Sequence, residues 1–399
     1  MTGLPVIVLT TIGILGCSAG PVRAGDGDAG ACQHAHAGAK PAAWPLWEAY
    51  KREFIAPDGR VMDHLAKHST SEGQAYAMFH ALVARDEATF RKVLGWAERH
   101  LARGDLGRTL PAWRWADGKV TDKNPASDAD LWMAYALVHA ASAFGDDRLA
   151  AKGGRLLALI EAREVEDLPG LGPMMLPGPV GFALPGGKWR LNPSYLPIQL
   201  LRWAARTDPD GPWGGIVEST LRLADAGTPG RVWPDWIAWN GSAFEPDPVS
   251  GAIGSYDAIR AYLWPALLHA DDPARGALLA RGTRLLEATR ALGLTPDRMD
   301  TRKVADLAEA VLSPNSPVGF RAIASVYARA LGDDTTADAL ARGIAAERRD
   351  SGLYGEPAFY YDQNLLLFAT GFVEGRYRFR ADGGLELISP PTDPACTPP

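Results

Sequence analysis

The chain has 399 residues, of which 47% are hydrophobic and 22% are charged, so it can bury a large core as one large domain or two ordinary ones. Its net charge is −6 at pH 7 and it has no run of lysine and arginine, which argues against nucleic acid or a membrane surface as a partner.

Residues 1–24 are predicted to be a secretory signal peptide. Residues 1–20 form an apolar run that is too short for a convincing membrane span, and the Val-Arg-Ala sequence at 22–24 offers a small-residue cleavage site. Cleavage there predicts a periplasmic or secreted protein with no membrane span in the mature chain. An alternative is a lipoprotein box at 14–17, which would leave Cys17 lipidated at the mature N-terminus.

Residues 25–43 contain Gly, Ala, Asp and His without periodicity and are predicted to be a disordered leader. His34 and His36 in this leader have no acidic or thiol partner in register, so we expect no metal site there. Cys32 in the leader and Cys396 near the C-terminus either form a disulfide in an oxidising compartment or remain two free thiols.

From residue 44 onward, apolar stretches with a helical period alternate with Gly and Pro breaks. The expected helices begin near Trp44, Glu72, Glu87, Asp128, Asp147, Ser194, Trp213, Tyr256, Pro273, Thr301, Val318, Thr335 and Phe359. Helical hairpins repeated in this way can close into a ring of inner and outer helices. We therefore expect an all-α fold, an (α/α)6 barrel, as a single domain over residues 44–389, followed by a C-terminal tail at 390–399.

Two segments interrupt the helical pattern. Met174 to Leu191 contains two Pro-Gly turn signals and is predicted to be a hairpin or a long loop. Arg376 to Ile388 alternates aromatic and basic residues around a turn at 382–384, which predicts a small hairpin. No nucleotide-binding, zinc-protease or serine-hydrolase motif occurs, so we expect neither a cofactor nor a metal.

Three of the predicted helix starts place a carboxylate beside a polar cap. Glu72 lies in STSEGQAYAMFHALV, Asp128 in ASDADLWMAYALVHAASAF and Asp257 in GSYDAIRAYLWPALL. Hydrolysis of a glycosidic bond needs acids from separate positions in one cleft, because one protonates the leaving oxygen while another activates water. The pattern therefore suggests a glycoside hydrolase.

Each acid also has a structural explanation. The helix dipole favours an ionised Glu72, which a general acid must avoid unless burial or a neighbouring carboxylate outweighs the dipole. Asp128 and Asp130 are two residues apart, so at most one of them faces a common cleft, and the other caps the helix or pairs with a neighbour. Asp257 and Arg260, three residues apart, are locally as consistent with a surface ion pair as with a base held ionised.

The segment ASDADLWMAYALVHAASAF resembles the signature of the family 8 glycoside hydrolases. The blocks TSEGQAYAM, NPSYLP, SYDAIR, PAWRW and PGLGPMMLPGPVGFA occur in the matching order. Together they are most similar to the periplasmic endoglucanases of bacterial cellulose synthesis systems, from about Trp44 to Phe379.

This resemblance implies an (α/α)6 barrel that acts as an inverting endo-β-1,4-glucanase, or cellulase. Glu72 would be the general acid, Asp257 the general base, and Asp128 would line the central sugar subsite and oppose ionisation of Glu72. The implied partners are a β-1,4-glucan chain and the cellulose synthase and export machinery, and we expect a monomer. Two alternatives remain, namely the same fold acting on chitosan or xylan, and a glucan-binding export factor with little turnover.

A glucan chain presents apolar ring faces and equatorial hydroxyls, so its cleft should combine flat aromatic side chains with hydrogen-bonding groups. The residues expected to bind it are Trp113, Trp115, Trp132, Asn192, Tyr195, Tyr256, Arg260 and Tyr361. Trp96, Trp203 and Trp264 lie within helical apolar runs and are expected to pack in the core.

Overall fold

The computed structural model describes residues 43–303 and 305–388. The predicted signal peptide with Cys17, almost all of the predicted leader with its two histidines, the Cys32–Cys396 pair and the C-terminal tail lie outside the described residues. Within the described part of the chain, no helix combines the length and the apolar character needed to cross a membrane.

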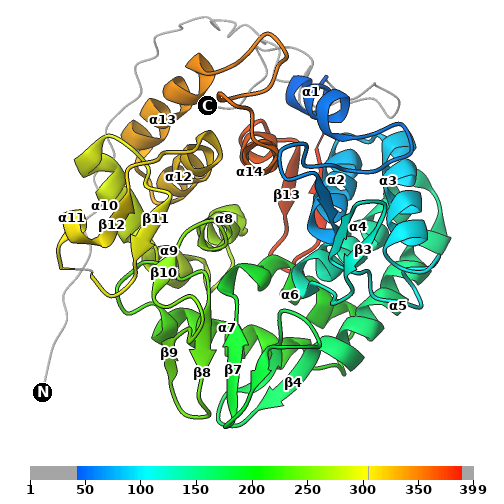
Figure 1. Ribbon diagram of the computed structural model, residues 1–399, viewed down its shortest axis with the longest axis horizontal. Coiled ribbons are helices and arrows are strands. Elements are labelled where there is room, and N and C mark those ends of the chain that lie inside the picture. The colour runs from blue at the N-terminus through cyan, green and yellow to red at the C-terminus, as the bar shows by residue number, and fades with distance from the viewer. Residues whose placement is uncertain (1–42, 304, 389–399) are drawn as a thin grey trace, which may run out of the picture. The chain divides into compact units, whose positions relative to one another are not determined.

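Six helices of the described chain form a closed inner ring, in which each helix contacts the next and the last contacts the first (Figure 1). They are α2 (Ser71–Val83), α4 (Ser127–Phe144), α6 (Ile198–Thr207), α8 (Ala258–Leu267), α12 (Val318–Ala330) and α14 (Tyr360–Val373).

An outer layer of helices packs against this ring, and each inner helix contacts at least one outer helix. The outer helices are α1 (Pro45–Phe54), α3 (Glu87–His100), α5 (Asp147–Glu164), α7 (Trp213–Gly227), α9 (Arg275–Ala280), α10 (Thr283–Leu292) and α13 (Asp334–Ala346). Two short helices, η1 (Pro193–Tyr195) and α11 (Leu307–Ala310), lie in connections. The expected (α/α)6 barrel is confirmed.

Composition explains which helices lie inside. Every residue of α2 except Glu72 is buried, and all ten residues of α8 are buried, including Arg260. A helix that is apolar on all sides needs protein contacts on all sides. The outer helix α3, in contrast, buries a single stripe of five residues among its fourteen. Alternation of these two helix types along the chain produces the two layers.

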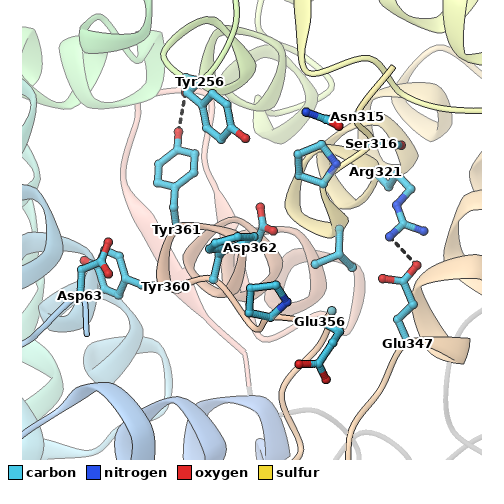
Figure 2. Close-up of a pocket in the computed structure, with 15 residues that line it drawn as sticks. Asp63, Tyr256, Asn315, Ser316, Arg321, Glu347, Glu356, Tyr360, Tyr361 and Asp362 are labelled. Atoms are coloured by element: carbon cyan, nitrogen blue, oxygen red, sulfur yellow. Dashed lines mark hydrogen bonds and ion pairs between the residues drawn. The ribbon is translucent and has the colours of Figure 1, made fainter. Parts of the chain in front are cut away.

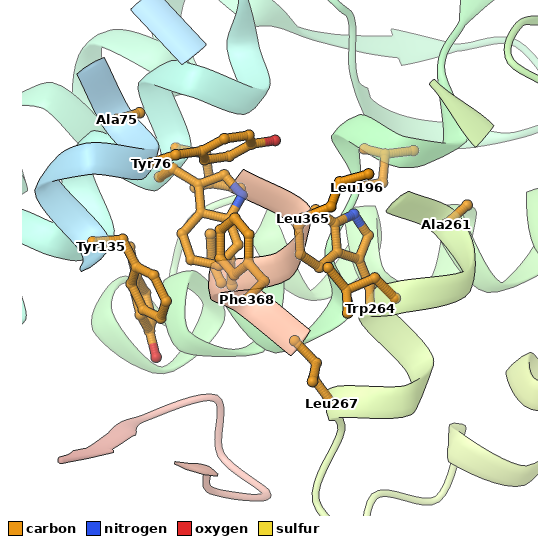
Figure 3. Packing of buried hydrophobic residues seen from close by; sticks show 14 of the residues in the cluster. Ala75, Tyr76, Tyr135, Leu196, Ala261, Trp264, Leu267, Leu365 and Phe368 are labelled. Carbon is orange, nitrogen blue, oxygen red and sulfur yellow. The ribbon is translucent and has the colours of Figure 1, made fainter. Parts of the chain in front are cut away.

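The centre of the ring is filled by aromatic side chains (Figure 3). Trp132 is only 1% exposed, and its ring centroid lies 4.9 Å from that of Phe79 and 5.2 Å from that of Phe368. Such tilted and edge-to-face contacts add to the burial energy of the rings. Trp96, Trp203 and Trp264 are also buried, as the sequence predicted.

Small antiparallel sheets lie in the connections between helices. The strands, grouped by sheet, are β1 (His68–Thr70), β2 (Arg114–Ala116) and β3 (Lys119–Asp122); β4 (Val165–Leu168) and β5 (Gly172–Met175); β6 (Ala183–Leu184), β7 (Lys188–Leu191), β8 (Ile237–Trp239) and β9 (Phe244–Pro246); β10 (Ile253–Gly254), β11 (Arg298–Asp300) and β12 (Val311–Ser313); and β13 (Tyr377–Phe379) and β14 (Leu385–Leu387). Strand β1 runs directly into α2, and β10 ends four residues before α8 begins. These strands therefore fix where two inner helices start.

Most predicted helices begin within a few residues of the observed ones, and the C-terminal hairpin is present as β13 and β14. The helix predicted near Thr301 is wrong. In its place, α11 has only four residues, and Val311 then pairs with Met299 in a sheet that the sequence analysis did not predict. The helix predicted near Pro273 is divided into α9 and α10 around Gly282, where a Cβ atom would overlap with the ring of Tyr262 and the hydroxyl oxygen of Tyr327.

The C-terminal hairpin contacts α6 closely at Gly383. This glycine has a φ of +79°, and a Cβ atom there would overlap with the carbonyl oxygen of Gln199 and the amide nitrogen of Trp203. Its own carbonyl accepts a hydrogen bond of 2.8 Å from the hydroxyl of Tyr135.

We predict that Gly383→Ala lowers the free energy of unfolding by about 2 kcal/mol or more, because left-handed strain adds to overlap with a neighbouring backbone. Thermal unfolding followed by circular dichroism measures the loss. Gly186→Ala is the matched control, since Gly186 has a φ of +82° and no described heavy atom within 4 Å of an added Cβ. Equal losses in the two variants would show that the contact with α6 contributes nothing.

Candidate active site

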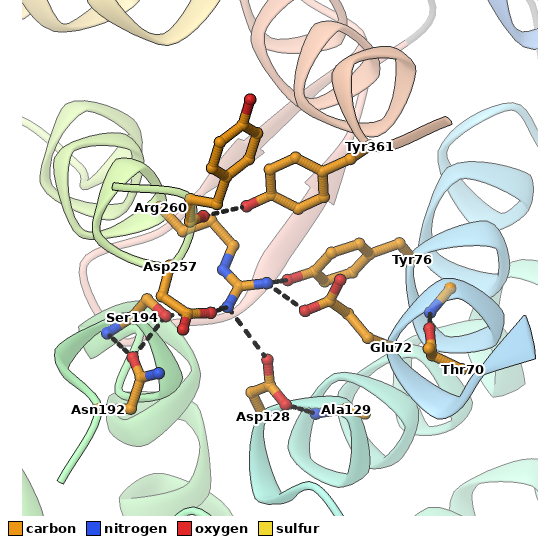
Figure 4. A network of polar contacts seen from close by, with 12 residues as sticks. Thr70, Glu72, Tyr76, Asp128, Ala129, Asn192, Ser194, Asp257, Arg260 and Tyr361 are labelled. Carbon is orange, nitrogen blue, oxygen red and sulfur yellow. Dashed lines mark hydrogen bonds and ion pairs between the residues drawn. The ribbon is translucent and has the colours of Figure 1, made fainter. Parts of the chain in front are cut away.

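The three carboxylates singled out in the sequence meet at the ends of three inner helices. Glu72 is the second residue of α2, Asp128 is the second residue of α4, and Asp257 directly precedes α8 (Figure 4). The hydroxyl of Thr70 caps α2 by accepting a hydrogen bond of 3.0 Å from Gly73. Ring closure thus brings together side chains that are far apart in the sequence.

All three carboxylates face the guanidinium group of Arg260 (Figure 4). Its Nη1 atom donates to Glu72, and its Nη2 atom donates to Asp257 over 2.9 Å. Nη2 also lies 3.9 Å from Asp128. Arg260 was expected to contact sugar, but it is only 2% exposed and its guanidinium group lies among the three carboxylates (Figure 4). It therefore acts as their shared counter-charge.

The three acids differ in exposure. The side chains of Glu72 and Asp257 are 22% and 34% exposed, whereas that of Asp128 is 2% exposed. Burial raises the pKa of Asp128 to about 8, and the charge of Glu72 acts in the same direction while Arg260 opposes it. At neutral pH Asp128 therefore carries a proton in the unliganded protein.

Arg260 is held from below by polar groups of η1. Its Nη2 donates to the hydroxyl of Ser194 over 3.0 Å, and that hydroxyl donates to Asn192 over 2.7 Å. Asn192 was expected to bind sugar, but it is fully buried, and within the described structure its side chain is linked to the site through the hydroxyl of Ser194. Its side chain also accepts from the Ser194 amide, so it shapes the turn that presents the hydroxyl.

Two residues beside Asp257 were missed by sequence reasoning. The indole Nε1 of Trp236 donates to Oδ2 of Asp257 over 3.0 Å. Asp235 accepts from the amides of Ser255 and Ala258, each over 2.7 Å. Burial raises the pKa of Asp235 to about 6. The Trp-rich, proline-containing stretch around these residues, VWPDWIAW, is the signal that could have identified them.

Of the aromatic residues expected to bind the glucan, most are partly exposed and one is buried in the core. Tyr256 is 50% exposed, and the hydroxyl of Tyr361 donates to its carbonyl over 2.7 Å. Trp113, Trp115, Tyr195 and Tyr361 are partly exposed. Trp132, which was expected in the groove, belongs to the core described above, because the helical turn that separates it from Asp128 directs it into the ring.

A cavity of about 600 Å³ adjoins the site on the side of Tyr256 and Tyr361 (Figure 2). It also contains an ion pair of 2.6 Å between Arg321 and Glu347. Asp362 in its wall is buried, which raises the pKa of this carboxyl to about 6. Aromatic rings beside charged and polar groups suit a ligand with apolar faces and many hydroxyls.

Comparison with known proteins gives a consistent result. Residues 31–372 match the model of the glycosyl hydrolases family 8, in agreement with the sequence motifs. An endoglucanase of Xanthomonas axonopodis pv. citri is 42% identical over 360 residues, which cover 88% of this chain and 91% of that protein. An endoglucanase of Escherichia coli K12 is 35% identical over 350 residues, covering 86% and 90%.

Solved structures show the same fold. An endo-1,4-D-glucanase from Vibrio fischeri matches with a TM-score of 0.79 and 35% identity, covering 86% of this chain and 99% of that chain. An endo-β-1,4-glucanase from Acetobacter xylinum matches with a TM-score of 0.65 and 27% identity, covering 82% and 95%.

A second pair of acids lies behind Asp128. Asp130 on α4 and Glu164 at the end of α5 are fully buried, and the carboxyl oxygens of both lack a hydrogen-bond partner among the described residues. Burial, followed by the charge of the other acids, holds the pKa of both carboxyls well above the usual range. Asp130 was expected either to cap the helix or to pair with a neighbour. It lies close enough to Glu164 for the charges of the two acids to interact, and burial favours the protonated form of both.

We predict that Asp130→Asn makes stability less dependent on pH. The raised pKa values stabilise the fold when the acids are protonated, and this contribution is lost as the pH rises through the folded-state pKa values. The Tm of the variant relative to the wild type should rise between pH 6 and 9, by on the order of 2 °C. Scanning calorimetry measures the difference.

The matched control is Glu218→Gln on the exposed face of α7, where we expect a constant offset across the same pH range. A pH slope identical to that of the wild type in Asp130→Asn would contradict the raised pKa of this buried acid.

Proposed function

The chain belongs to family 8 of the glycosyl hydrolases, and from this premise we propose that it is an inverting endo-β-1,4-glucanase acting on a cellulose-type glucan. The observation that carries the proposal is the convergence of Glu72, Asp128 and Asp257 on one buried guanidinium group. The endoglucanase names of its relatives support the same activity.

In this proposal Glu72 is the general acid and Asp257 is the general base. Inversion requires carboxyl groups about 6.5 to 9.5 Å apart, so that a water molecule fits between the base and the sugar. Arg260 contacts the two carboxylates through different nitrogens and stands between them, which supports separate roles. Both are more exposed than Asp128, as groups that meet sugar and water must be.

Asp257 is well suited to be the base. Its Oδ1 accepts from Arg260 and its Oδ2 accepts from Trp236, so both contacts favour the ionised carboxylate. It is also the most exposed of the three acids, which gives an attacking water access to it.

The acid role of Glu72 needs a source for its proton. Three carboxylates surround one guanidinium in a largely buried site, so the cluster keeps a proton at neutral pH, which Asp128 holds in the unliganded protein. We propose that this proton passes to Glu72 when a glucan displaces water and loosens the contact with Arg260. Asp128 then lies ionised beneath the central sugar and positions the ring or the water.

The glucan would run along the aromatic residues on both sides of the acids. Trp113 and Trp115 lie on the side of the β1–β2–β3 sheet, and Tyr195 is the last residue of η1. Tyr256 and Tyr361 lead into the cavity of Figure 2. Tyrosine and tryptophan faces cover sugar rings, and the polar groups of the cavity supply hydrogen bonds.

The proposed setting is the bacterial periplasm, during synthesis and export of cellulose. It rests on the predicted signal peptide and on the motif resemblance. In that setting the partners are a β-1,4-glucan chain and the synthase and export machinery.

We predict that Glu72→Gln lowers kcat on unactivated glucan by about 10² to 10⁴-fold, because the amide cannot protonate the leaving oxygen. Release of reducing ends from carboxymethylcellulose measures the rate. Glu87→Gln is the matched control, since Glu87 is an exposed first-turn glutamate of the outer helix α3. Substantial activity in Glu72→Gln would exclude Glu72 as the acid.

We also predict that the wild-type protein releases reducing ends from carboxymethylcellulose faster than from chitosan or xylan. Proton NMR of freshly cut cello-oligosaccharides should show the α-anomer first, because inversion changes the configuration of a β-bond. Initial release of the β-anomer would show retention. Binding without release from any of the three polymers would favour the glucan-binding alternative.

A further inference from the structure

Asp257 is unusual among the helix-capping aspartates of the described chain. Asp86, Asp146, Asp306 and Asp333 also occupy N-cap positions, and each accepts a hydrogen bond from a backbone amide of its own helix. The side chain of Asp257 makes no such bond to α8 within the described structure. Its carboxylate is therefore free to face the site.

Asp235 performs the missing capping role from a distant loop. Its Oδ1 accepts from the amide of Ala258, the first residue of α8, and from the amide of Ser255. The first amides of a helix need acceptors, and a carboxylate is a favourable one because of the helix dipole. Because Asp235 already accepts from the first amide of α8, a hydrogen bond from this amide to Asp257 would add no stability.

Trp236, the next residue, fixes the second oxygen of Asp257. Its indole ring stacks on Phe182 with centroids 5.8 Å apart and an interplanar angle of 2°. The guanidinium of Arg190 lies 4.6 Å from the ring centroid and is held by two hydrogen bonds to Asp247, of 2.7 and 2.9 Å. The Nε1 donor therefore belongs to a ring that is held in place by contacts with both Phe182 and Arg190.

The backbone around Asp257 is clamped as well. The amide of Asp235 donates to the carbonyl of Ile253 over 2.7 Å, and a Cβ atom on Gly254 would overlap with the carbonyl oxygen of Trp233. On the other side, the hydroxyl of Ser255 donates to the carbonyl of Asp297 over 2.7 Å. The loop at 233–236 and the segment at 253–258 thus form one rigid unit.

We propose that Asp235 and Trp236 are positioning residues for the general base. Asp235 caps α8 in place of Asp257, and Trp236 holds the released carboxylate in the orientation in which it also contacts Arg260. This inference rests on the proposed function, because it takes Asp257 to be the base. It assigns no direct contact with the reacting atoms to either residue.

The test compares kcat and KM on carboxymethylcellulose for Trp236→Phe, Asp235→Ala and Asp235→Asn. Trp236→Phe keeps an aromatic ring and removes the N–H donor, so kcat should fall about tenfold, the rate equivalent of one hydrogen bond to a charged group, while KM stays within about twofold. Asp235→Ala lets Asp257 turn back to cap α8 and should lower kcat further. Asp235→Asn keeps an oxygen acceptor and should recover most of that loss.

Two control variants separate positioning from stability. Trp239→Phe removes an indole hydrogen bond of 2.9 Å to the carbonyl of Pro169, away from Asp257. Asp333→Ala removes the cap of the outer helix α13. Both should lower Tm and leave kcat unchanged, so a fall in kcat confined to the variants at Asp235 and Trp236 would support the proposal.

Three results would overturn it. A higher KM with unchanged kcat in Trp236→Phe would make Trp236 a sugar platform only. Unchanged kcat in both Trp236→Phe and Asp235→Asn, with lower Tm, would make the loop merely structural, and this outcome stands even if Asp235→Ala does not fold. Equal losses of kcat in Asp235→Asn and Asp235→Ala would show that the side-chain oxygen at position 235 does not act as the cap of α8.

If the wild-type protein itself releases no reducing ends from any glucan, the proposed function fails instead.

Discussion

The buried guanidinium of Arg260 is the group on which the site depends. A positive charge that is 2% exposed must be compensated nearby, because transfer of a charge from water into a protein interior costs several kcal/mol. Glu72 and Asp257 provide that compensation from the N-terminal ends of two different inner helices, and Asp128 lies 3.9 Å from the same guanidinium group. The three acids, in turn, can share a small space only because a cation lies between them. Charge balance therefore links closure of the helical ring to assembly of the site.

The two-layered barrel places these charges at helix N-termini, where backbone amides are available and a charged side chain can reach the surface. The apolar remainder of each inner helix leads directly into the aromatic core, so the site rests on closely packed and inflexible elements. The short sheets before α2 and α8 add to this rigidity by fixing the residues at which those helices begin. In α2, α4 and α8 the N-terminal end therefore holds an acid of the candidate site, and the rest of the helix packs in the core.

The site also contains features that reduce stability. Asp128, Asp130 and Glu164 are buried carboxyls with oxygens that lack hydrogen-bond partners among the described residues, and they keep protons as a result. Asp257 gives up the stabilising capping role that other aspartates of the chain perform, and Asp235 supplies it from elsewhere. Such departures from the most stable arrangement are expected where function requires charged groups to be poised.

The sequence by itself determined the alternation of helices, the polar caps and the spaced motifs, because helical period and capping chemistry are local properties. It thereby predicted the barrel and singled out Glu72, Asp128 and Asp257, which the structure brings together around Arg260. Only the tertiary structure decided which way side chains face. The sequence around a helical tryptophan is the same kind of pattern whether its ring packs in the core or lines a cleft. Trp132 proved to be core, whereas Trp236, which sequence reasoning passed over, contacts Asp257. These outcomes depend on residues brought together by ring closure, and no local pattern records such contacts.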